Sequence, residues 1–354
     1  MSPSRTVIAL IVAVSLLAAA CGPGASSAST TPSGAPSVEP TARPSQAPVA
    51  LTVGLGFIPS VQFAPFYLAD QAGYYEEAGL TVEIQNNIDP DLITLVGQGG
   101  DGGLDIGLGD GTSVIPAVSQ GIPIKYVATI YGQFPSIVFA KASSGITSAA
   151  DLKGVKLGIP GRYGSSWIML QALLASAGLT PEDLEIVEYP DFGQGAAVAQ
   201  GAVQAATGFA NNEPVQLALS GEPVTILRVD DITPLPGNGL IVGTKTLDTK
   251  SDAIAAFIAA TLRAMEEIAD DPEVGLEAAI KAVPDLATAR ETQAAILKAT
   301  IEAWRGPVQD ARGLGAIEPA DWATSIDYLE TLDLVPNPVT VDDLLETGLL
   351  PPGG

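Results

Sequence analysis

The sequence predicts an α/β protein of two lobes separated by a central cleft, with a helical C-terminal region. Short apolar strand patterns alternate with helical patterns in two successive series, and each series indicates helices layered on a largely parallel sheet. The chain crosses between the two series twice, which is typical of a hinged pair of lobes. A length of 354 residues is sufficient for two separate hydrophobic cores.

The first fifty residues differ in composition from the rest. Residues 1–20 are predicted to be a signal peptide, because Arg5 precedes an apolar run that is too short for a membrane-spanning helix. Small residues lead up to Cys21, as in the lipobox of bacterial lipoproteins, although Ala18 stands where that motif prefers leucine. We therefore expect lipidation of Cys21, the alternative being an ordinary secretory signal. Residues 21–49 contain almost no large apolar side chains and predict a disordered linker.

The first α/β series follows this linker. Its apolar runs and alternating patterns predict short strands, and helical spacing fills the intervals between them. Gly79 is a natural C-terminal stop for the first helix. The predicted strands span residues 51–55, 80–84, 105–109 and 124–130, and the predicted helices span residues 66–78, 92–97 and 113–120.

A second series begins near residue 146, after a strand at 136–140 that is expected to leave the first lobe. A strand at 240–244 is expected to return to it. The lobes are therefore predicted as residues 50–145 with 230–354, and residues 146–229. The second series predicts strands at 156–159, 184–189, 205–209 and 224–228 and helices at 166–177, 193–200 and 214–219. The last third predicts helices at 251–270, 273–282, 287–303 and 319–332.

Charge and composition exclude several classes of function. The chain has 16 Lys and Arg against 40 Asp and Glu, a formal charge of −24, and such a surface repels nucleic acid. It has no histidine, which removes the commonest general base and transition-metal ligand. Its single cysteine excludes an intrachain disulfide. No resident cofactor or metal is expected, and no loop spaces its carboxylates as a calcium motif does.

Several segments of the folded part resemble one family. Residues 57–84, FIPSVQFAPFYLADQAGYYEEAGLTVEI, are similar to the opening of the periplasmic solute-binding proteins for alkanesulfonates, nitrate, thiamine-precursor pyrimidines and riboflavin. Three further segments also resemble this group: residues 103–130, 146–179 and 322–345. The phrase FIPSVQFAPFY looks most like the riboflavin-binding subgroup.

This resemblance implies a type II periplasmic-binding-protein fold that closes on a small molecule in its cleft. It also implies a non-enzymatic role as a monomeric subunit of an ABC importer, working with a permease and, through it, an ATPase. With a lipid anchor, the protein is expected on the extracytoplasmic side of the cell membrane. Some members of the wider group are pyrimidine-phosphate synthases that sacrifice their own histidine on a pyridoxal cofactor, and this chain has no histidine.

Candidate ligand contacts lie where predicted strands give way to helices, the usual place for ligands of α/β sheets. Each candidate has a simpler interpretation, which is core packing for the aromatic residues and helix capping for the polar ones. The clusters that follow the predicted strands at 51–55 and 105–109 contribute Phe57, Gln62, Phe63, Asp110 and Thr112. Later strand ends contribute Tyr131, Arg162, Tyr163, Ser165, Ser166, Asn211 and Glu213.

The chemistry of these residues favours a flat, neutral ligand. The rim motifs supply one cation, Arg162, against Asp110, Asp191 and Glu213, whereas sulfonate and nitrate binders need positive charge or convergent N–H donors. Aromatic rings and amides suit stacking and hydrogen bonding to a heterocycle. Riboflavin is therefore the first choice, and a thiamine-precursor pyrimidine or an alkanesulfonate-type anion is the alternative. A lipid-anchored hydrolase and a sensory or adhesive lipoprotein without a transport role are the rivals from other classes.

Overall fold

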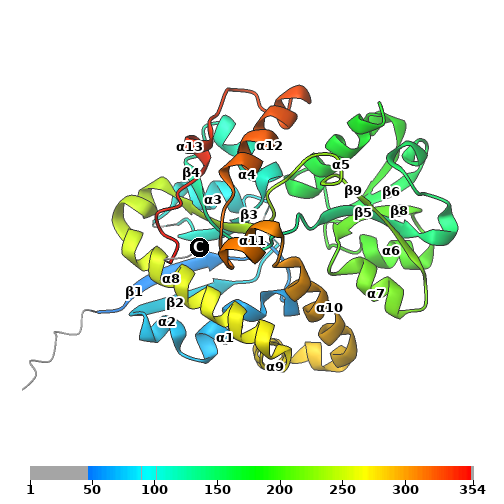
Figure 1. Cartoon of the computed structure of the whole chain (residues 1–354). Helices are drawn as coiled ribbons and strands as arrows, with labels where there is room; N and C mark the ends of the chain where they lie inside the picture. The colour runs from blue at the N-terminus through cyan, green and yellow to red at the C-terminus, as the bar shows by residue number, and fades with distance from the viewer. Residues whose placement is uncertain (1–46, 89, 101, 352–354) are drawn as a thin grey trace, which may run out of the picture. The chain divides into compact units, whose positions relative to one another are not determined.

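The computed structural model describes residues 47–351 except 89 and 101, and within them the chain forms two five-stranded sheets with helices on their faces (Figure 1). The predicted signal peptide, the lipidation at Cys21 and nearly all of the predicted linker lie outside the described residues. The first strand begins at Val49, inside the stretch predicted as linker. None of the described helices is long and apolar enough to span a bilayer.

The first sheet has the strand order β2-β1-β3-β10-β4. β1 is parallel to β2 and β3, whereas β10 runs antiparallel to β3 and β4. The sheet is therefore mixed rather than largely parallel, because the returning strand inserts in the opposite direction. Its strands are β1 (Val49–Gly54), β2 (Leu80–Gln85), β3 (Ile106–Gly109), β4 (Ile124–Thr129) and β10 (Gly239–Gly243).

The second sheet has the order β7-β6-β8-β5-β9. β5 lies between β8 and β9 and is antiparallel to both. The lobe boundary predicted at residue 145 therefore assigned β5 to the wrong lobe, because the chain crosses between the lobes before this strand. An apolar run shows that a strand is buried, but not which sheet it joins. The strands are β5 (Ser136–Lys141), β6 (Lys156–Ile159), β7 (Glu185–Glu188), β8 (Ala205–Phe209) and β9 (Val224–Arg228).

Helices cover both faces of the first sheet. On one face Tyr75 stacks on Phe257 of α8 with ring centroids 4.9 Å apart. On the other, Trp322 of α12 meets Tyr126 of β4 edge to face at 4.7 Å. The helices are η1 (Val61–Phe63), α1 (Ala64–Gln71), α2 (Tyr74–Glu77), α3 (Leu92–Gln98), α4 (Gly111–Ser119), α8 (Thr244–Asp270), α9 (Pro272–Ala282), η5 (Pro284–Ala289), α10 (Arg290–Ala303), α11 (Pro307–Arg312), α12 (Pro319–Thr331) and α13 (Val341–Leu344).

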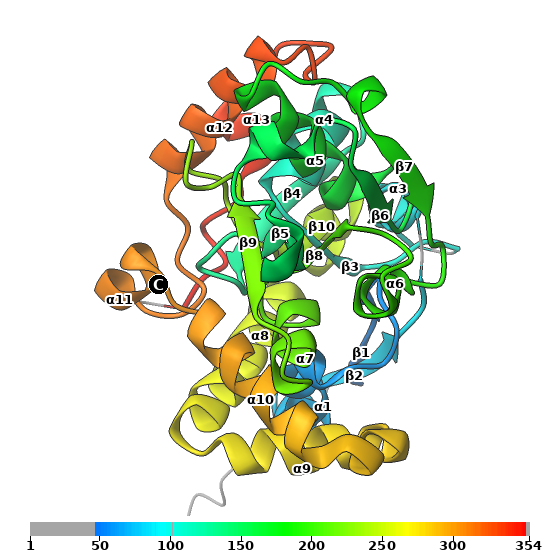
Figure 2. The ribbon, with the colours of Figure 1, turned by 90° about the vertical axis from the view of Figure 1, so that its right-hand side faces the viewer.

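The second sheet is also covered on both faces. Alternate residues of β5 point to opposite sides, so Val138 packs with the cluster under α5 while Ile137 packs with the cluster under α6 and α7. α10 of the first lobe lies against α7 of the second (Figure 2). The second lobe's helices are η2 (Ala142–Ser144), η3 (Ala149–Leu152), α5 (Gly164–Ser176), η4 (Pro181–Asp183), α6 (Gln194–Gln200) and α7 (Glu213–Leu219).

Candidate ligand-binding site

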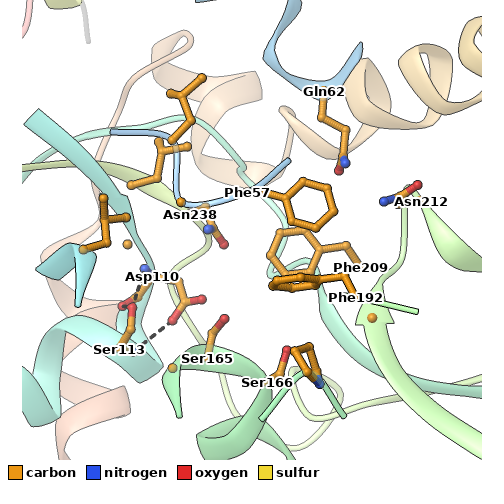
Figure 3. A pocket seen from close by; sticks show the side chains of 18 of the residues that line it. Phe57, Gln62, Asp110, Ser113, Ser165, Ser166, Phe192, Phe209, Asn212 and Asn238 are labelled. Atoms are coloured by element: carbon orange, nitrogen blue, oxygen red, sulfur yellow. Dashed lines mark hydrogen bonds between the residues drawn. The ribbon is translucent and has the colours of Figure 1, made fainter. Parts of the chain in front are cut away.

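A pocket of about 200 Å³ lies between the two sheets, at the carboxyl ends of β1, β3, β6 and β8 (Figure 3). This volume is several times the ~30 Å³ share of one water molecule, so the pocket has room for a ring system. Open α/β sheets bind ligands at this edge, because loops from several strands converge there. Nine residues predicted from the sequence line it: Phe57, Gln62, Phe63, Asp110, Tyr131, Tyr163, Ser165, Ser166 and Glu213.

One wall of the pocket is aromatic. Phe57 of the first lobe meets Phe192 of the second edge to face, with ring centroids 4.9 Å apart. Phe57 also contacts Phe63 at 6.5 Å, and Tyr131 contacts Phe209 at the same separation. Such edge contacts leave ring faces for a flat ligand. Phe192 has a φ of 59°, an unusual conformation for a phenylalanine.

The opposite end of the pocket is polar and centres on Asp110. This residue caps α4, and its Oδ1 accepts hydrogen bonds from Thr112 Oγ1 at 2.7 Å and from Ser113 N at 3.0 Å. Only 1% of Asp110 is exposed. Its Oδ2 has no hydrogen-bond partner among the described residues. Thr112 does not line the pocket; it supports the Asp110 carboxylate from behind.

Burial raises the pKa of Asp110, because desolvation disfavours the charged form. Hydrogen bonds from Thr112 and Ser113 act in the opposite direction, and so does the nearby Ser165 hydroxyl. No described Lys or Arg side chain lines the pocket. Asp110 is therefore a buried acid with no cation in the described part of the site, and its Oδ2 accepts no hydrogen bond there.

The first turn of α5 faces Asp110 across the pocket. Gly164, Ser165 and Ser166 line the cavity, and no side-chain cap forms at Tyr163, the residue that precedes the helix. The first N–H groups of a helix have no partner within the helix. The end of α5 therefore presents hydrogen-bond donors close to an acceptor, and Figure 3 shows Ser165 beside Asp110.

Asn211 lies behind the pocket wall and joins the two lobes. Its Nδ2 donates to Gln62 Oε1 and to Thr300 Oγ1, both at 2.8 Å. Tyr131 Oη lies 3.4 Å from the same nitrogen, and burial raises the pKa of Tyr131. Asn211 is thus not among the lining residues, because its amide is directed at the opposite lobe.

Glu213 begins α7 and lies half-buried in the pocket wall. Its Oε2 accepts a hydrogen bond from Phe209 N at 2.9 Å, and burial raises its pKa. The carboxyl group packs against Gly208 and the Cγ atom against Gly195, where a Cβ atom would come within 3.0 Å of the Glu213 side chain. The glycines therefore make the space that lets this acid lie at the wall.

Arg162, the one cation predicted at the site, does not line the pocket. Its Nε lies 3.3 Å from Glu188 Oε1, and its guanidinium lies over the Trp167 ring, 5.1 Å from the centroid. The local sequence gives no sign of this pairing, because Glu188 lies on a different strand. The predicted cation is thus held by an acid of its own lobe.

Two amides line the pocket that sequence reasoning missed. Gln194 is 1% exposed, and its Nε2 donates to Thr207 O at 3.3 Å while Oε1 has no partner in the described part of the chain. Asn238 precedes β10, and its Oδ1 also lacks a partner there. Each follows a glycine, which is a weak signal for a residue close to a ligand. No cluster of three or more potential metal ligands occurs among the described residues.

Comparisons with known proteins agree with this architecture. A profile of the NMT1/THI5-like family matches residues 60–274. The riboflavin-binding protein RibY of Chloroflexus aurantiacus is 30% identical over 352 residues, which cover 98% of each chain. The formylaminopyrimidine-binding protein of Halalkalibacterium halodurans is 25% identical over 302 residues, 82% of this chain and 88% of the relative.

A solved structure shares the fold. The alkanesulfonate-binding protein SsuA from Xanthomonas axonopodis pv. citri, bound to MOPS, aligns with a TM-score of 0.66 at 17% identity and covers 86% of this chain and 100% of its own. The family match spans more than half of the sequence, and the similarity to RibY spans nearly all of it. The chain therefore belongs to the NMT1/THI5-like family and has the two-lobed fold of periplasmic solute-binding proteins.

Proposed function

We propose that this protein is the extracytoplasmic substrate-binding lipoprotein of an ABC importer and that it captures a flat, neutral heterocyclic vitamin, with riboflavin favoured. The observation that carries this proposal is the pocket lining. Phenylalanine rings form one wall, and the rest of the lining combines aliphatic side chains with serines, amides and the acids Asp110 and Glu213. No Lys or Arg is among the described lining residues. This arrangement suits a heteroaromatic ring with N–H groups.

The relatives support the same ligand class. RibY, which resembles this chain over its whole length, is named for riboflavin binding. The isoalloxazine ring of riboflavin is flat and uncharged, and its ribityl chain carries hydroxyl donors for acceptors such as Glu213 and Asn238. The Phe57 and Phe192 rings lie where they can contact such a ring system from both lobes.

Two other ligands are the alternatives. A thiamine-precursor pyrimidine is also flat and rich in N–H groups, and a relative named for formylaminopyrimidine binding covers most of this chain. An alkanesulfonate-type anion is the weaker alternative, because the buried acid Asp110 and the half-buried Glu213 would oppose it and Arg162 is held by Glu188.

We further propose a binding role without catalysis, as a monomer. With no histidine in the sequence, a hydrolase would have to work through carboxylates alone. A recovered ligand that is chemically changed after incubation with the protein would contradict this role. Delivery to a permease and its ATPase follows from lobe closure, which presents a new surface once the ligand is held.

Anchoring depends on Cys21. Diacyl modification there would hold the protein at the outer face of the cell membrane, since more than one chain gives stable attachment. Expression in a bacterial host with a lipoprotein pathway should place the chain in the detergent phase on Triton X-114 partition. Cys21→Ser should move it to the aqueous phase. If both proteins partition identically, the lipoprotein proposal is wrong.

The ligand is tested by titrating the purified protein into riboflavin and following flavin fluorescence. We expect quenching at micromolar protein or below, because Tyr131 and Tyr163 line the pocket and a phenol can donate an electron to the excited flavin. Formylaminopyrimidine and MOPS serve as competitors for the two alternatives. Unchanged flavin emission at micromolar protein would exclude riboflavin. If MOPS displaces bound riboflavin at a concentration below that of riboflavin itself, the anion is favoured.

A further inference from the structure

The polar end of the pocket carries a recognition pattern of its own. Three residues that line the pocket each have a buried side-chain oxygen without a partner among the described residues: Asp110 Oδ2, Gln194 Oε1 and Asn238 Oδ1. A buried acceptor without a donor destabilises the unliganded site, because it has lost its hydrogen bonds to water. A ligand that supplies donors to these oxygens removes that cost, whereas a ligand with only acceptors adds repulsion.

Donors lie directly beside the first of these oxygens. The first turn of α5 has no side-chain cap, and Ser165 and Ser166 line the pocket. Ser165 is close enough to Asp110 to influence its ionisation. The polar end therefore presents one fixed acceptor next to several donors, rather than a general polar surface.

We propose that Asp110 and the first turn of α5 recognise a carbonyl–NH edge of the ligand and that Asp110 is the specificity-determining residue. Asp110 Oδ2 accepts the ring N–H, and the α5 N–H and serine hydroxyl groups donate to the adjacent carbonyl oxygens. This inference rests on the proposed function and deepens it. In riboflavin the matching edge is N3–H between the C2 and C4 carbonyls.

The fixed orientation of Asp110 supports this role. Thr112 and Ser113 hold Oδ1, so the carboxylate cannot rotate without losing both bonds, and Oδ2 is left directed into the cavity (Figure 3). A preorganised acceptor loses little entropy on binding. An anionic ligand, in contrast, would meet a buried acid at the place where it needs donors.

The test compares two proteins with two ligands. Asp110→Asn keeps the side-chain volume and remains a good helix cap. It replaces the charged Oδ2 acceptor in the pocket with an uncharged amide group. 3-Methylriboflavin replaces the N3 hydrogen with a methyl group. Wild-type protein should bind 3-methylriboflavin about 10- to 100-fold more weakly than riboflavin, as expected for loss of a hydrogen bond to a charged group. In Asp110→Asn the two ligands should bind within about threefold of each other.

A matched control separates this effect from helix capping. Asp271 caps α9 and accepts a hydrogen bond from Glu273 N, and it is exposed and outside the pocket. Asp271→Asn should keep the full difference between the two flavins. Circular dichroism and thermal unfolding establish that each variant is folded before titration.

The outcomes also distinguish this inference from the riboflavin proposal. If the wild type binds riboflavin but does not distinguish 3-methylriboflavin, or if Asp110→Asn still distinguishes it, the recognition inference is wrong and riboflavin binding stands. If the wild type does not bind riboflavin, formylaminopyrimidine and MOPS are titrated into both proteins. Loss of formylaminopyrimidine binding in Asp110→Asn supports the inference, whereas MOPS binding that is unchanged in Asp110→Asn, or no binding of any probe, overturns it.

Discussion

Two buried aspartates lie at the two ends of β3, and they have different environments. Asp105, before the strand, accepts a hydrogen bond from Thr52 N at 2.9 Å and pairs with Lys250 Nζ at 2.8 Å. Asp110, after the strand, has one oxygen held by its own helix and the other free in the pocket. Burial of a carboxylate alone therefore does not distinguish the two residues; the unsatisfied oxygen of a pocket-lining side chain distinguishes Asp110 and supports its proposed role.

The pairing of Asp105 suits a structural role. Lys250 also donates to Ala50 O, so it ties β1 and the start of α8 to the loop before β3. Lys250 stands at a non-helical residue within α8, with φ −132° and ψ 23°. Asp110 accepts hydrogen bonds from Thr112 and Ser113 of its own helix, and Ser165 of α5 lies beside it in the pocket.

The largest expected effect is on folding stability at the Asp105 end. Asp105→Asn leaves Lys250 without its counter-charge and should lower the free energy of unfolding by about 2 kcal/mol, since breaking a mostly buried pair is costly. Urea unfolding measures this value. Ligand affinity should be unchanged in the folded variant, and a loss of affinity larger than the loss of stability would remove the distinction between the two aspartates.

The next effect is a pH dependence that belongs to Asp110. Burial raises its folded-state pKa above 3.8, so the folded protein binds this proton more tightly than the unfolded chain does. The contribution of Asp110 to stability is therefore greatest below pH 3.8 and declines as the pH rises through the raised pKa, by about 1.4 kcal/mol for each pKa unit. The measurement is urea unfolding of wild type and Asp110→Asn from pH 4 to pH 8.

The difference between the two free energies of unfolding should change between pH 4 and pH 8. Asp110→Asn should gain stability relative to the wild type as the pH rises. The pH dependence that surface carboxylates give to the free energy of unfolding has the opposite sign and serves as an internal reference. Asp151, Asp183 and Asp343 accept hydrogen bonds from nearby threonine or serine groups that lower their pKa values, so their contributions are lost as the pH falls. A difference curve that is flat from pH 4 to pH 8 would contradict the assignment to Asp110.

The smallest expected effect concerns closure of the lobes over the pocket. Asn211→Ala removes the hydrogen bonds to Gln62 and Thr300 and should weaken ligand binding about fivefold, near 1 kcal/mol, because the closed arrangement loses a tie between the lobes. Small-angle scattering of the ligand-free variant should show a larger radius of gyration. Asn337→Ala, which removes a bond to Ser119 O within the first lobe, is the control and should change neither value.

Sequence reasoning succeeded for the positions of the strands. All ten strands lie near their predicted positions, because runs of apolar residues reveal burial without knowledge of the partner. Nine of the twelve predicted ligand contacts line the pocket, since loops after parallel strands meet at one edge of a sheet. Their contact with a ligand remains a prediction.

Errors arose where a residue's partner is distant in the sequence. β5 joined the second sheet, Arg162 paired with Glu188, and Asn211 turned toward Gln62 of the other lobe. Gln194 and Asn238 were missed because a single amide beside a glycine is common in turns and carries no periodic signal.

The sequence by itself determined the α/β class, the positions of the strands and the acidic, histidine-free chemistry, since these depend on composition and local periodicity. Only the tertiary structure decided which acid is neutralised and which is left with a free oxygen. Asp105 and Asp110 are five residues apart, but the cation that distinguishes them, Lys250, lies 145 residues further along the chain from Asp105. Electrostatic pairing depends on distance in space, and local sequence does not encode it.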